Sequence, residues 1–276
     1  MTPSLVPFAV VVLLALSARP LQAPASRLDA CVSKPAGRFS LPRDLAEISG
    51  LAWANDALLA HGDETASIYR IDGVRGSVTR VAFLEGRPRD DFEGIAVTDS
   101  QLVLGTSKGR LYLAGWPAAP GTLPYRVVET GLGRGCELEG LAWDAGSGAL
   151  LMPCKRVAGE KRKHGLTVRR WHLARGAPLQ PVVVRAEAMA RAGLPGFRAT
   201  SIEVDPRTGN WILFSGAEPG AVEMTPAGNI LRAVRLSHGL HRQPEALALS
   251  PDGDLFVADE AAGFRATLTR YRCAIR

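Results

Sequence analysis

The sequence predicts an all-β protein, a five-bladed β-propeller of four-stranded blades that an N-terminal strand closes. Three observations lead to this fold. A short motif recurs five times, each recurrence is followed by a similar series of short apolar runs, and the last unit lacks one run that the start of the chain can supply. Repeats of roughly 45 residues with four strands each are typical of propeller blades.

The recurring motif is clearest at Glu139-Gly140-Leu141-Ala142-Trp143. Related stretches begin at Phe92 and Pro244, and degenerate ones begin at Ile48 and Ala199. The residue at the glutamate position of each stretch is here named the marker, and the five markers are Ser49, Glu93, Glu139, Thr200 and Glu245. The steps between markers are 44, 46, 61 and 45 residues, so we expect blades that start near residues 47, 91, 137, 198 and 243.

Each of the first four units contains four runs of four to eight residues that are rich in β-branched and aromatic residues and are separated by Gly, Asp, Asn and Pro. Strands are expected at 48–53, 57–61, 67–71, 78–84, 92–97, 102–105, 110–114, 125–130, 138–143, 149–153, 166–173, 182–185, 200–204, 211–214, 221–224 and 231–236. The third unit is longer because it adds a basic loop at 155–164 and a short helical stretch at 187–192.

The fifth unit supplies only three runs, at 246–249, 255–258 and 267–273. The missing outer strand is available at the other end of the chain, as Gly37–Leu41. If this strand completes the last blade, no open sheet edge remains where the ring closes. We therefore expect the propeller to comprise residues 37–276, preceded by a lead-in at 24–36.

Residues 1–23 resemble a secretory signal peptide. Their apolar run, Phe8–Leu16, is shorter than the roughly 20 residues that a membrane-spanning helix needs. An uncleaved anchor is the alternative. The sequence thus predicts export to the periplasm or the medium, with no membrane span after signal cleavage.

Four cysteines in an exported chain suggest two disulfides, for which three pairings exist. A hairpin that turns at 144–148 would bring Cys136 near Cys154. The remaining pair, Cys31 with Cys273, would then lie at the two ends of the chain, where the closing strand meets the last blade. We expect the pairs Cys31–Cys273 and Cys136–Cys154.

The net charge of +6 on 276 residues is a mild bias, which favours acidic small molecules slightly but does not imply nucleic acid. The most basic run, Lys161–His164, has no interleaved aromatic residues and can equally be a solvated loop. We expect no nucleic-acid partner, and a monomer that binds a small molecule or a protein.

The candidate site is the mouth of the central channel at which the five markers converge, because the first strand of each blade lines that channel. Glu93, Glu139 and Glu245 would repel one another there unless a cation or bound protons intervened. Carboxylate oxygens suit calcium, so these three residues are candidate metal ligands. The alternative is that each glutamate accepts backbone N–H bonds or pairs with a neighbouring Lys or Arg.

An outer ring of charged residues is expected where the second strands end at the same mouth: Asp63, Glu64, Lys108, Lys155, Arg156, Glu218, Asp259 and Glu260. Of these, Lys108, Lys155 and Arg156 are candidate ligands for an anion, together with the polar markers Ser49 and Thr200. No HExxH motif is present, and no GxSxG nucleophile elbow, a turn from a strand into a helix, is expected. The two tryptophans at equivalent repeat positions, Trp53 and Trp143, are expected in the core.

The repeats resemble the SdiA-regulated proteins, a bacterial propeller family related to phytase-like and NHL-like propellers. The motifs that carry the resemblance are Ile48–Leu51, Asp91–Ile95, Leu138–Ala142, Gln243–Ala248 and Gly253–Val257. The resemblance covers roughly residues 45–262. It implies a five-bladed propeller with a calcium site near the axis, held by Glu93, Glu139 and Glu245, and no established reaction. Two second-strand ends depart from the acidic pattern of the family, at Lys108 and Lys155, which favours an anionic ligand.

The leading functional hypothesis is an exported, calcium-associated propeller that binds a ligand or partner at its mouth without catalysis. A second hypothesis is a phytase-like phosphoester hydrolase in which calcium polarises the phosphate and Lys108, Lys155 and Arg156 hold its other oxygens. A third is a lactonase or esterase of the propeller type.

Overall fold

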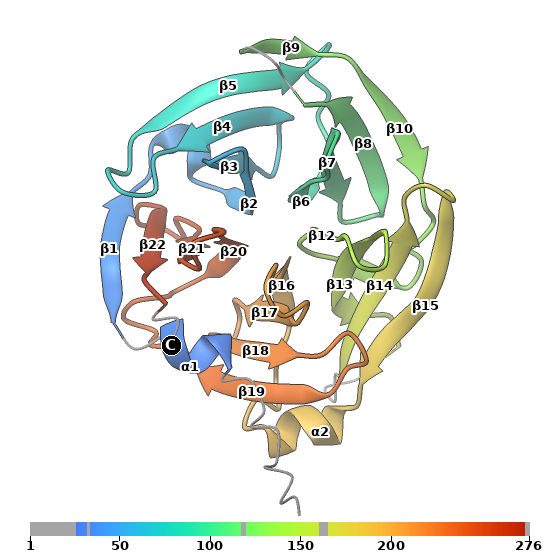
Figure 1. Ribbon diagram of the computed structural model, residues 1–276, viewed down its shortest axis with the longest axis vertical. Helices are drawn as coiled ribbons and strands as arrows, with labels where there is room; N and C mark the ends of the chain where they lie inside the picture. Colours follow the sequence, from blue (N-terminus) through green and yellow to red (C-terminus); the bar gives the residue numbers. More distant parts are fainter. Residues whose placement is uncertain (1–25, 32–33, 117–119, 160–164, 274–276) are drawn as a thin grey trace, which may run out of the picture.

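The chain forms five small antiparallel sheets arranged in a ring, as the computed structural model shows (Figure 1). The structure describes residues 26–31, 34–116, 120–159 and 165–273. The prediction of a five-bladed β-propeller is confirmed. The expected signal peptide, the first residues of the lead-in and the basic run 161–164 lie outside the described residues.

In the first, second and fourth blades, four strands pair in chain order from the axis outwards. The first blade contains β2 (Ile48–Ala54), β3 (Ala57–Gly62), β4 (Ser67–Ile71) and β5 (Val78–Leu84). The second contains β6 (Phe92–Val97), β7 (Gln101–Thr106), β8 (Arg110–Gly115) and β10 (Tyr125–Glu129). The fourth contains β16 (Ala199–Val204), β17 (Trp211–Ser215), β18 (Gly220–Met224) and β19 (Ile230–Arg235).

The third blade departs from the predicted pattern at its inner strand. The expected single strand is divided into β11 (Cys136–Leu138) and β12 (Ala142–Asp144), both of which pair with β13 (Ala149–Val157). Gly140 lies in the gap with φ of 75°, a left-handed conformation that interrupts a strand. The blade is completed by β14 (Leu166–His172) and β15 (Ala177–Val184), and the expected helical stretch follows as α2 (Ala186–Arg191).

The ring closes as expected. β1 (Pro35–Ser40) pairs antiparallel with β22 (Thr267–Tyr271), and β21 (Leu255–Asp259) and β20 (Pro244–Leu249) complete the fifth blade. Both predicted disulfides are present, Cys31–Cys273 at this closure and Cys136–Cys154 between β11 and β13. The first and last parts of the ring are therefore joined by a sheet and by a covalent bond.

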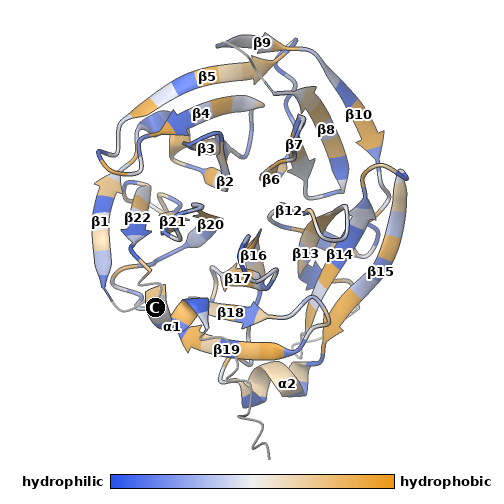
Figure 2. Ribbon diagram, viewed as in Figure 1, coloured by the Kyte–Doolittle hydropathy of each residue, from blue (hydrophilic) through white to orange (hydrophobic). Residues whose placement is uncertain are grey.

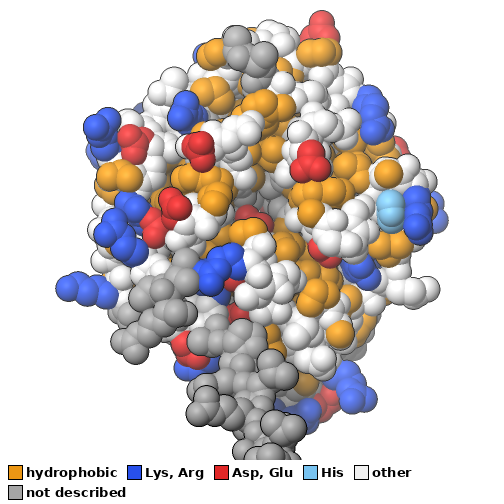
Figure 3. All heavy atoms as spheres, in the orientation of Figure 1, with side chains coloured by type: hydrophobic (Ala, Val, Ile, Leu, Met, Phe, Trp, Pro, Cys, Tyr) orange, Lys and Arg blue, Asp and Glu red, His pale blue; other side chains and the backbone are white. Residues whose placement is uncertain are grey.

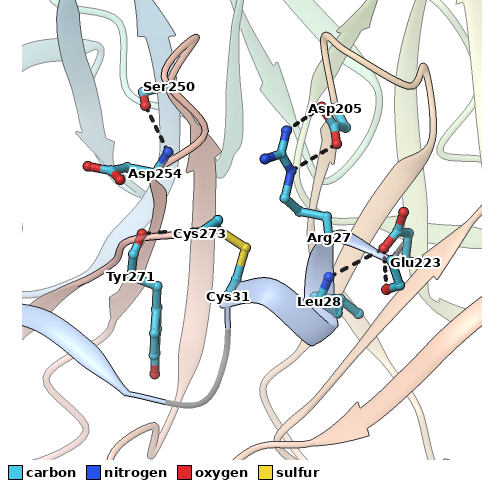
Figure 4. The surroundings of a disulfide bond; sticks show 10 residues. Arg27, Leu28, Cys31, Asp205, Glu223, Ser250, Asp254, Tyr271 and Cys273 are labelled. Atoms are coloured by element: carbon cyan, nitrogen blue, oxygen red, sulfur yellow. Dashed lines mark hydrogen bonds and ion pairs between the residues drawn. A yellow bond between two sulfur atoms is a disulfide. The ribbon is translucent and has the colours of Figure 1, made fainter. Parts of the chain in front are cut away.

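The lead-in contains a short helix that the sequence did not predict, α1 (Arg27–Cys31), which packs against β18 and β19 of the fourth blade. The guanidinium group of Arg27 donates to both carboxylate oxygens of Asp205 at 2.9 Å, and both residues are buried. The backbone N–H of Leu28 donates to Glu223 at 3.4 Å (Figure 4). The chain thus docks on the fourth blade before it enters the fifth, so both blades hold the N-terminal segment.

Five hydrophobic clusters form the core, one at each interface between neighbouring blades. The inner strands are almost wholly buried, whereas most residues of the outer strands β5, β10, β15 and β19 are half-buried or exposed, and these strands mix polar with apolar residues (Figure 2). A further strand, β9 (Gly121–Leu123), leaves the second blade and pairs parallel with β5 of the first. The core fixes each inner strand against its two neighbours, and this packing positions the markers.

Candidate functional site

The residue that follows each marker is small, because neighbouring inner strands approach closely at the axis. These residues are Gly50, Gly94, Gly140, Ser201 and Ala246. A Cβ added to Gly94 would lie 2.5 Å from the backbone nitrogen of Leu141, and the Gly140 N–H donates to the Glu93 carbonyl at 2.6 Å. The repeated Glu-Gly pair is therefore first a packing requirement of the five-bladed ring.

The structure brings the three marker glutamates together around a single lysine. Lys155 follows the predicted end of the second strand of the third blade, and its Nζ lies 3.0 Å from Oε1 of Glu139. Glu139 and Glu245 are buried, and Glu93 is half-buried. We name this end of the channel the marker mouth, and define it by Glu93, Glu139, Glu245 and Lys155.

The two polar markers bind the backbone instead. The hydroxyl group of Thr200 donates to the carbonyl of Pro244 at 2.6 Å, which ties the fourth blade to the fifth. The hydroxyl group of Ser49 donates to the carbonyl of Glu47 in its own loop at 3.3 Å. Both residues lie at the marker positions of the ring, but their hydroxyl donors are engaged within the protein.

The pKa values of Glu93 and Glu139 in the marker mouth are raised above the ordinary value of a glutamate. Burial raises the pKa of Glu93, and repulsion from Glu139 and Asp91 raises it further. Burial also raises the pKa of Glu139, although Lys155 and a hydrogen bond with Glu93 oppose that rise. Of this hydrogen-bonded pair of carboxyl groups, Glu93 therefore keeps its proton, and Glu139 carries the negative charge next to the Lys155 ammonium group.

The pKa of Glu245 is raised, as are the pKa values of Glu93 and Glu139. Burial raises its pKa to about 8, in spite of the attraction of Lys155, and repulsion from Glu139 and Glu260 adds to the shift. For Lys155 itself, burial alone would lower the pKa, but Glu139, Glu245 and Glu93 together raise it above its ordinary value. The lysine is thus held charged by three carboxyl groups that cannot all ionise at neutral pH.

Further carboxyl groups lie near Glu245, where the first and fifth blades meet. Burial and repulsion from Glu47 raise the pKa of Asp63 to about 6. Burial, Glu47 and Asp63 raise the pKa of Glu260, whose side chain accepts a hydrogen bond from Gln243. Sequence reasoning included Asp63 and Glu260 but missed Glu47 and Gln243. Both stand two residues before a marker, in the loop that enters the first strand of a blade, and that repeated position could have identified them.

Lys108 and Arg156 lie apart from the marker mouth. Both are exposed and line a shallow depression between the second and third blades, where Arg156 donates to Glu137 at 3.0 Å. Lys155 and Arg156 are neighbours in β13, and Lys155 is the extra residue of a β-bulge there, because Glu137 pairs with Arg156 and Leu138 pairs with Cys154. The three basic residues that the sequence suggested as one anion site are therefore divided between two places.

The side chains of the marker mouth are of the type that binds calcium, but they are not arranged as a calcium site. Its carboxylate oxygens are hard ligands of the type that calcium takes, yet the Lys155 ammonium group already lies against Glu139. Within the part of the chain that the structure describes, no group of three or more His, Cys, Asp or Glu side chains is placed to hold a metal ion. Calcium at this mouth stays a prediction, and nothing below depends on it.

Comparison with known proteins agrees with the fold. No protein-family model and no curated protein matches the chain. Among solved structures, a glutaminyl cyclase of Myxococcus xanthus is similar with a TM-score of 0.58 and 15% identity, covering 88% of this chain and 96% of that one. A PQQ-bound aldose sugar dehydrogenase of Streptomyces coelicolor has a TM-score of 0.51 and 12% identity, covering 86% and 99%. A Bacteroides thetaiotaomicron protein of unknown function has a TM-score of 0.50 and 14% identity, covering 81% and 55%.

These similarities define the class of protein, a β-propeller with bacterial propeller neighbours. At such identities they show the fold alone. None of the three names the SdiA-regulated family. Among the described residues, no helix has the length and apolar character that crossing a membrane requires.

Proposed function

We propose that this is an exported β-propeller that binds a cationic, amine-bearing ligand at the marker mouth. The observation that carries the proposal is the shortage of positive charge there. Three buried or half-buried glutamates share the one ammonium group of Lys155, and further carboxyl groups lie near Glu245. A ligand ammonium group would supply the missing charge and would replace protons that the glutamates hold at neutral pH.

Electrostatics favour a cation over the anionic ligand that the sequence suggested. An anion would have to approach carboxyl groups, and of the three basic residues only Lys155 lies at the mouth, already bonded to Glu139. Because Lys108 and Arg156 lie apart from Lys155, the three basic residues do not form the single phosphate-binding site that the phosphoester hydrolase hypothesis requires. Binding without hydrolysis is therefore the better supported of these functions.

Export is supported by the two disulfides, because such bonds persist in oxidising compartments. We propose a monomer that is periplasmic or secreted. The fold needs no second copy to close its ring, since β1 supplies the outer strand of the fifth blade from the same chain.

Calorimetric titration with 1,4-diaminobutane tests the proposal, and butane-1,4-diol is the matched neutral probe. We expect the diamine to bind and the diol not to bind. Because protons are displaced, the measured enthalpy should depend on the ionisation enthalpy of the buffer. Glu245→Gln and Glu139→Gln should each weaken binding of the diamine by roughly tenfold, the range of a charge-assisted hydrogen bond. Glu187→Gln, on the exposed surface of α2, is the control.

Three results would contradict the proposal: equal binding of the two probes, binding of inositol hexaphosphate in place of the diamine, or no binding of either probe. A parallel titration with calcium tests the predicted metal separately. Calcium binding that Glu245→Gln abolishes would support a metal ligand at the same residues, and it would identify the cation as inorganic.

A second candidate function, acid–base catalysis, is favoured by the pair formed by Glu93 and Glu139. A carboxyl group that holds a proton next to one that carries a charge is an arrangement used for proton transfer. The similarity to a glutaminyl cyclase suggests one assay, the release of ammonia from a peptide with an N-terminal glutamine. We expect turnover by the wild type and loss of turnover in Glu139→Gln if this candidate is right, and no ammonia from either protein if it is wrong.

A further inference from the structure

The opposite end of the channel contains a second hollow, which has no part in the proposed function. We name it the turn mouth, because the first strand of each blade turns there into the second strand. The cavity measures about 490 Å³ and is lined by residues of all five blades. Figure 3 shows this face, with hydrophobic side chains gathered around a central hollow. The fourth residue after each marker lies in its wall: Trp53, Val97, Trp143, Val204 and Leu249.

The walls are apolar and include two indole rings. Trp53 and Trp143, which the sequence placed in the core, are only partly buried and take part in the lining. Trp53 also stacks on Phe256 with ring centroids 5.6 Å apart, which holds its ring in place. Aliphatic side chains, among them Ile95 and Leu141, complete the wall. An apolar molecule of modest size could therefore be buried here.

All the ionisable side chains of this wall are acidic. They are Asp144, Glu203 and Asp205, and no Lys, Arg or His is among the described residues that line the cavity. The Asp205 carboxylate is occupied by Arg27, and the Asp144 carboxylate accepts the hydroxyl group of Ser147 in its own turn. Of these three carboxyl groups, only that of Glu203 has no side-chain hydrogen bond or ion pair in the described part of the chain.

Glu203 comes from β16, and its Oε1 accepts the backbone N–H of Val204 at 2.8 Å. Burial raises the pKa of Glu203 to about 8, even though the N–H groups of Val204 and Leu249 favour its charged form. A half-buried carboxyl group that lines a cavity and has no basic side chain beside it in that lining is a natural counter-charge for a bound cation. The indoles and this carboxyl group belong to one cavity.

We propose that the turn mouth is a second ligand site, which takes a small organic ammonium ion with an apolar body. Indole rings attract organic cations, and aromatic walls combined with a carboxylate are the usual means of binding alkylated ammonium groups. The aliphatic walls would bury the apolar part of the ligand, and the cavity volume lies within the usual range for small-molecule sites, roughly 300–1,000 Å³. A strongly hydrated metal ion would make no use of the apolar wall. A neutral ring compound would give the Glu203 carboxylate no positive charge to interact with.

Choline and 3,3-dimethylbutan-1-ol test the proposal, because they have the same shape and only choline is charged. Binding of each to the wild-type protein is measured by calorimetry and by changes in the NMR signals of the indole N–H groups. We expect choline to bind at least about tenfold more tightly than the alcohol. Glu203→Gln and Trp143→Leu should each weaken choline binding by roughly five- to tenfold, and Glu187→Gln should leave it unchanged.

Equal affinity for the two probes would overturn the proposal, as would the absence of choline binding to the wild type. Choline binding that survives Glu203→Gln but is lost in Glu245→Gln would assign the ligand to the marker mouth and would also overturn it. Melting curves check that each variant folds. If a variant fails to fold, the indole N–H signals of the wild-type protein decide the result: choline should shift them, because Trp53 and Trp143 line the turn mouth, and signals that do not move would overturn the proposal.

Discussion

Replacing Glu245 with Gln should change how the stability of this protein depends on pH. Burial raises the pKa of Glu245 from 4.5 to about 8 in the folded protein, with added repulsion from Glu139 and Glu260. The folded state therefore binds this proton more tightly than the unfolded state. The stabilisation is fully present below the unfolded pKa of 4.5 and is lost as the pH rises to about 8. Gln cannot titrate, so the variant should not show this loss.

The size of the effect follows from the shift. One pKa unit corresponds to about 1.36 kcal/mol, so a rise from 4.5 to about 8 is an upper limit of about 5 kcal/mol. Glu139 and Glu93 titrate in the same cluster and take part of this change, so we expect about 2–4 kcal/mol for Glu245. The difference in unfolding free energy between variant and wild type should therefore grow by this amount, in favour of the variant, from pH 5 to pH 8.5.

Urea unfolding at a series of pH values measures this difference. Glu187→Gln serves as the matched control, because it removes one carboxyl group from the exposed surface of α2. Parallel stability curves for the wild type and Glu245→Gln would refute the reasoning. They would mean that Glu245 ionises as easily in the folded protein as in the unfolded chain, and that the marker mouth holds no shortage of positive charge.

Three further substitutions test the architecture. Gly94→Ala should destabilise the protein by roughly 2 kcal/mol or more in a denaturation assay, because the new Cβ would lie 2.5 Å from the backbone of the next blade. The control is Gly115→Ala, which should change the unfolding free energy little because the space around Gly115 is open. Replacing both Cys31 and Cys273 with Ala should lower the unfolding free energy by about 2–5 kcal/mol, since their bond closes a loop of 242 residues. An unchanged melting temperature would contradict a role in closure. Arg27→Met should cost about 3 kcal/mol by leaving a buried carboxylate unpaired, and an effect below about 0.5 kcal/mol would show that α1 is not held by this ion pair.

Most of the fold could be predicted because each blade is built from contacts that are local in the sequence. Strands of one blade follow one another through short turns, so apolar runs and turn residues locate them to within a few residues. The exceptions depend on contacts between blades. β9 exists because Gly121–Leu123 meets β5 of another blade, and the division of β11 from β12 at Gly140 reflects the close approach of Ser201. No local pattern reports such contacts.

The candidate site could be predicted in position but not in chemistry. The repeat register indicates that Glu93, Glu139 and Glu245 converge, and the structure places them around one lysine. That Lys155 lies near the axis while Arg156 does not could not have been inferred from a regular alternation of side chains, because a β-bulge between β11 and β13 lies at Lys155. The pKa shifts could not have been inferred, because they depend on how deeply each carboxyl group is buried and on which neighbours face it.

The two mouths lie at opposite ends of the inner strands of the five blades, and the residues between them separate the two sites. Two residues after each marker stands a buried aliphatic side chain, and each of these five belongs to a different cluster between blades: Leu51, Ile95, Leu141, Ile202 and Leu247. Because these side chains are fixed in the core, a layer of apolar side chains separates the charged groups of the two mouths. Substitutions at Glu245 should therefore leave binding at the turn mouth intact, and substitutions at Glu203 should leave the marker mouth intact. Coupling between the two would require the aliphatic layer to move, and hence the blades themselves.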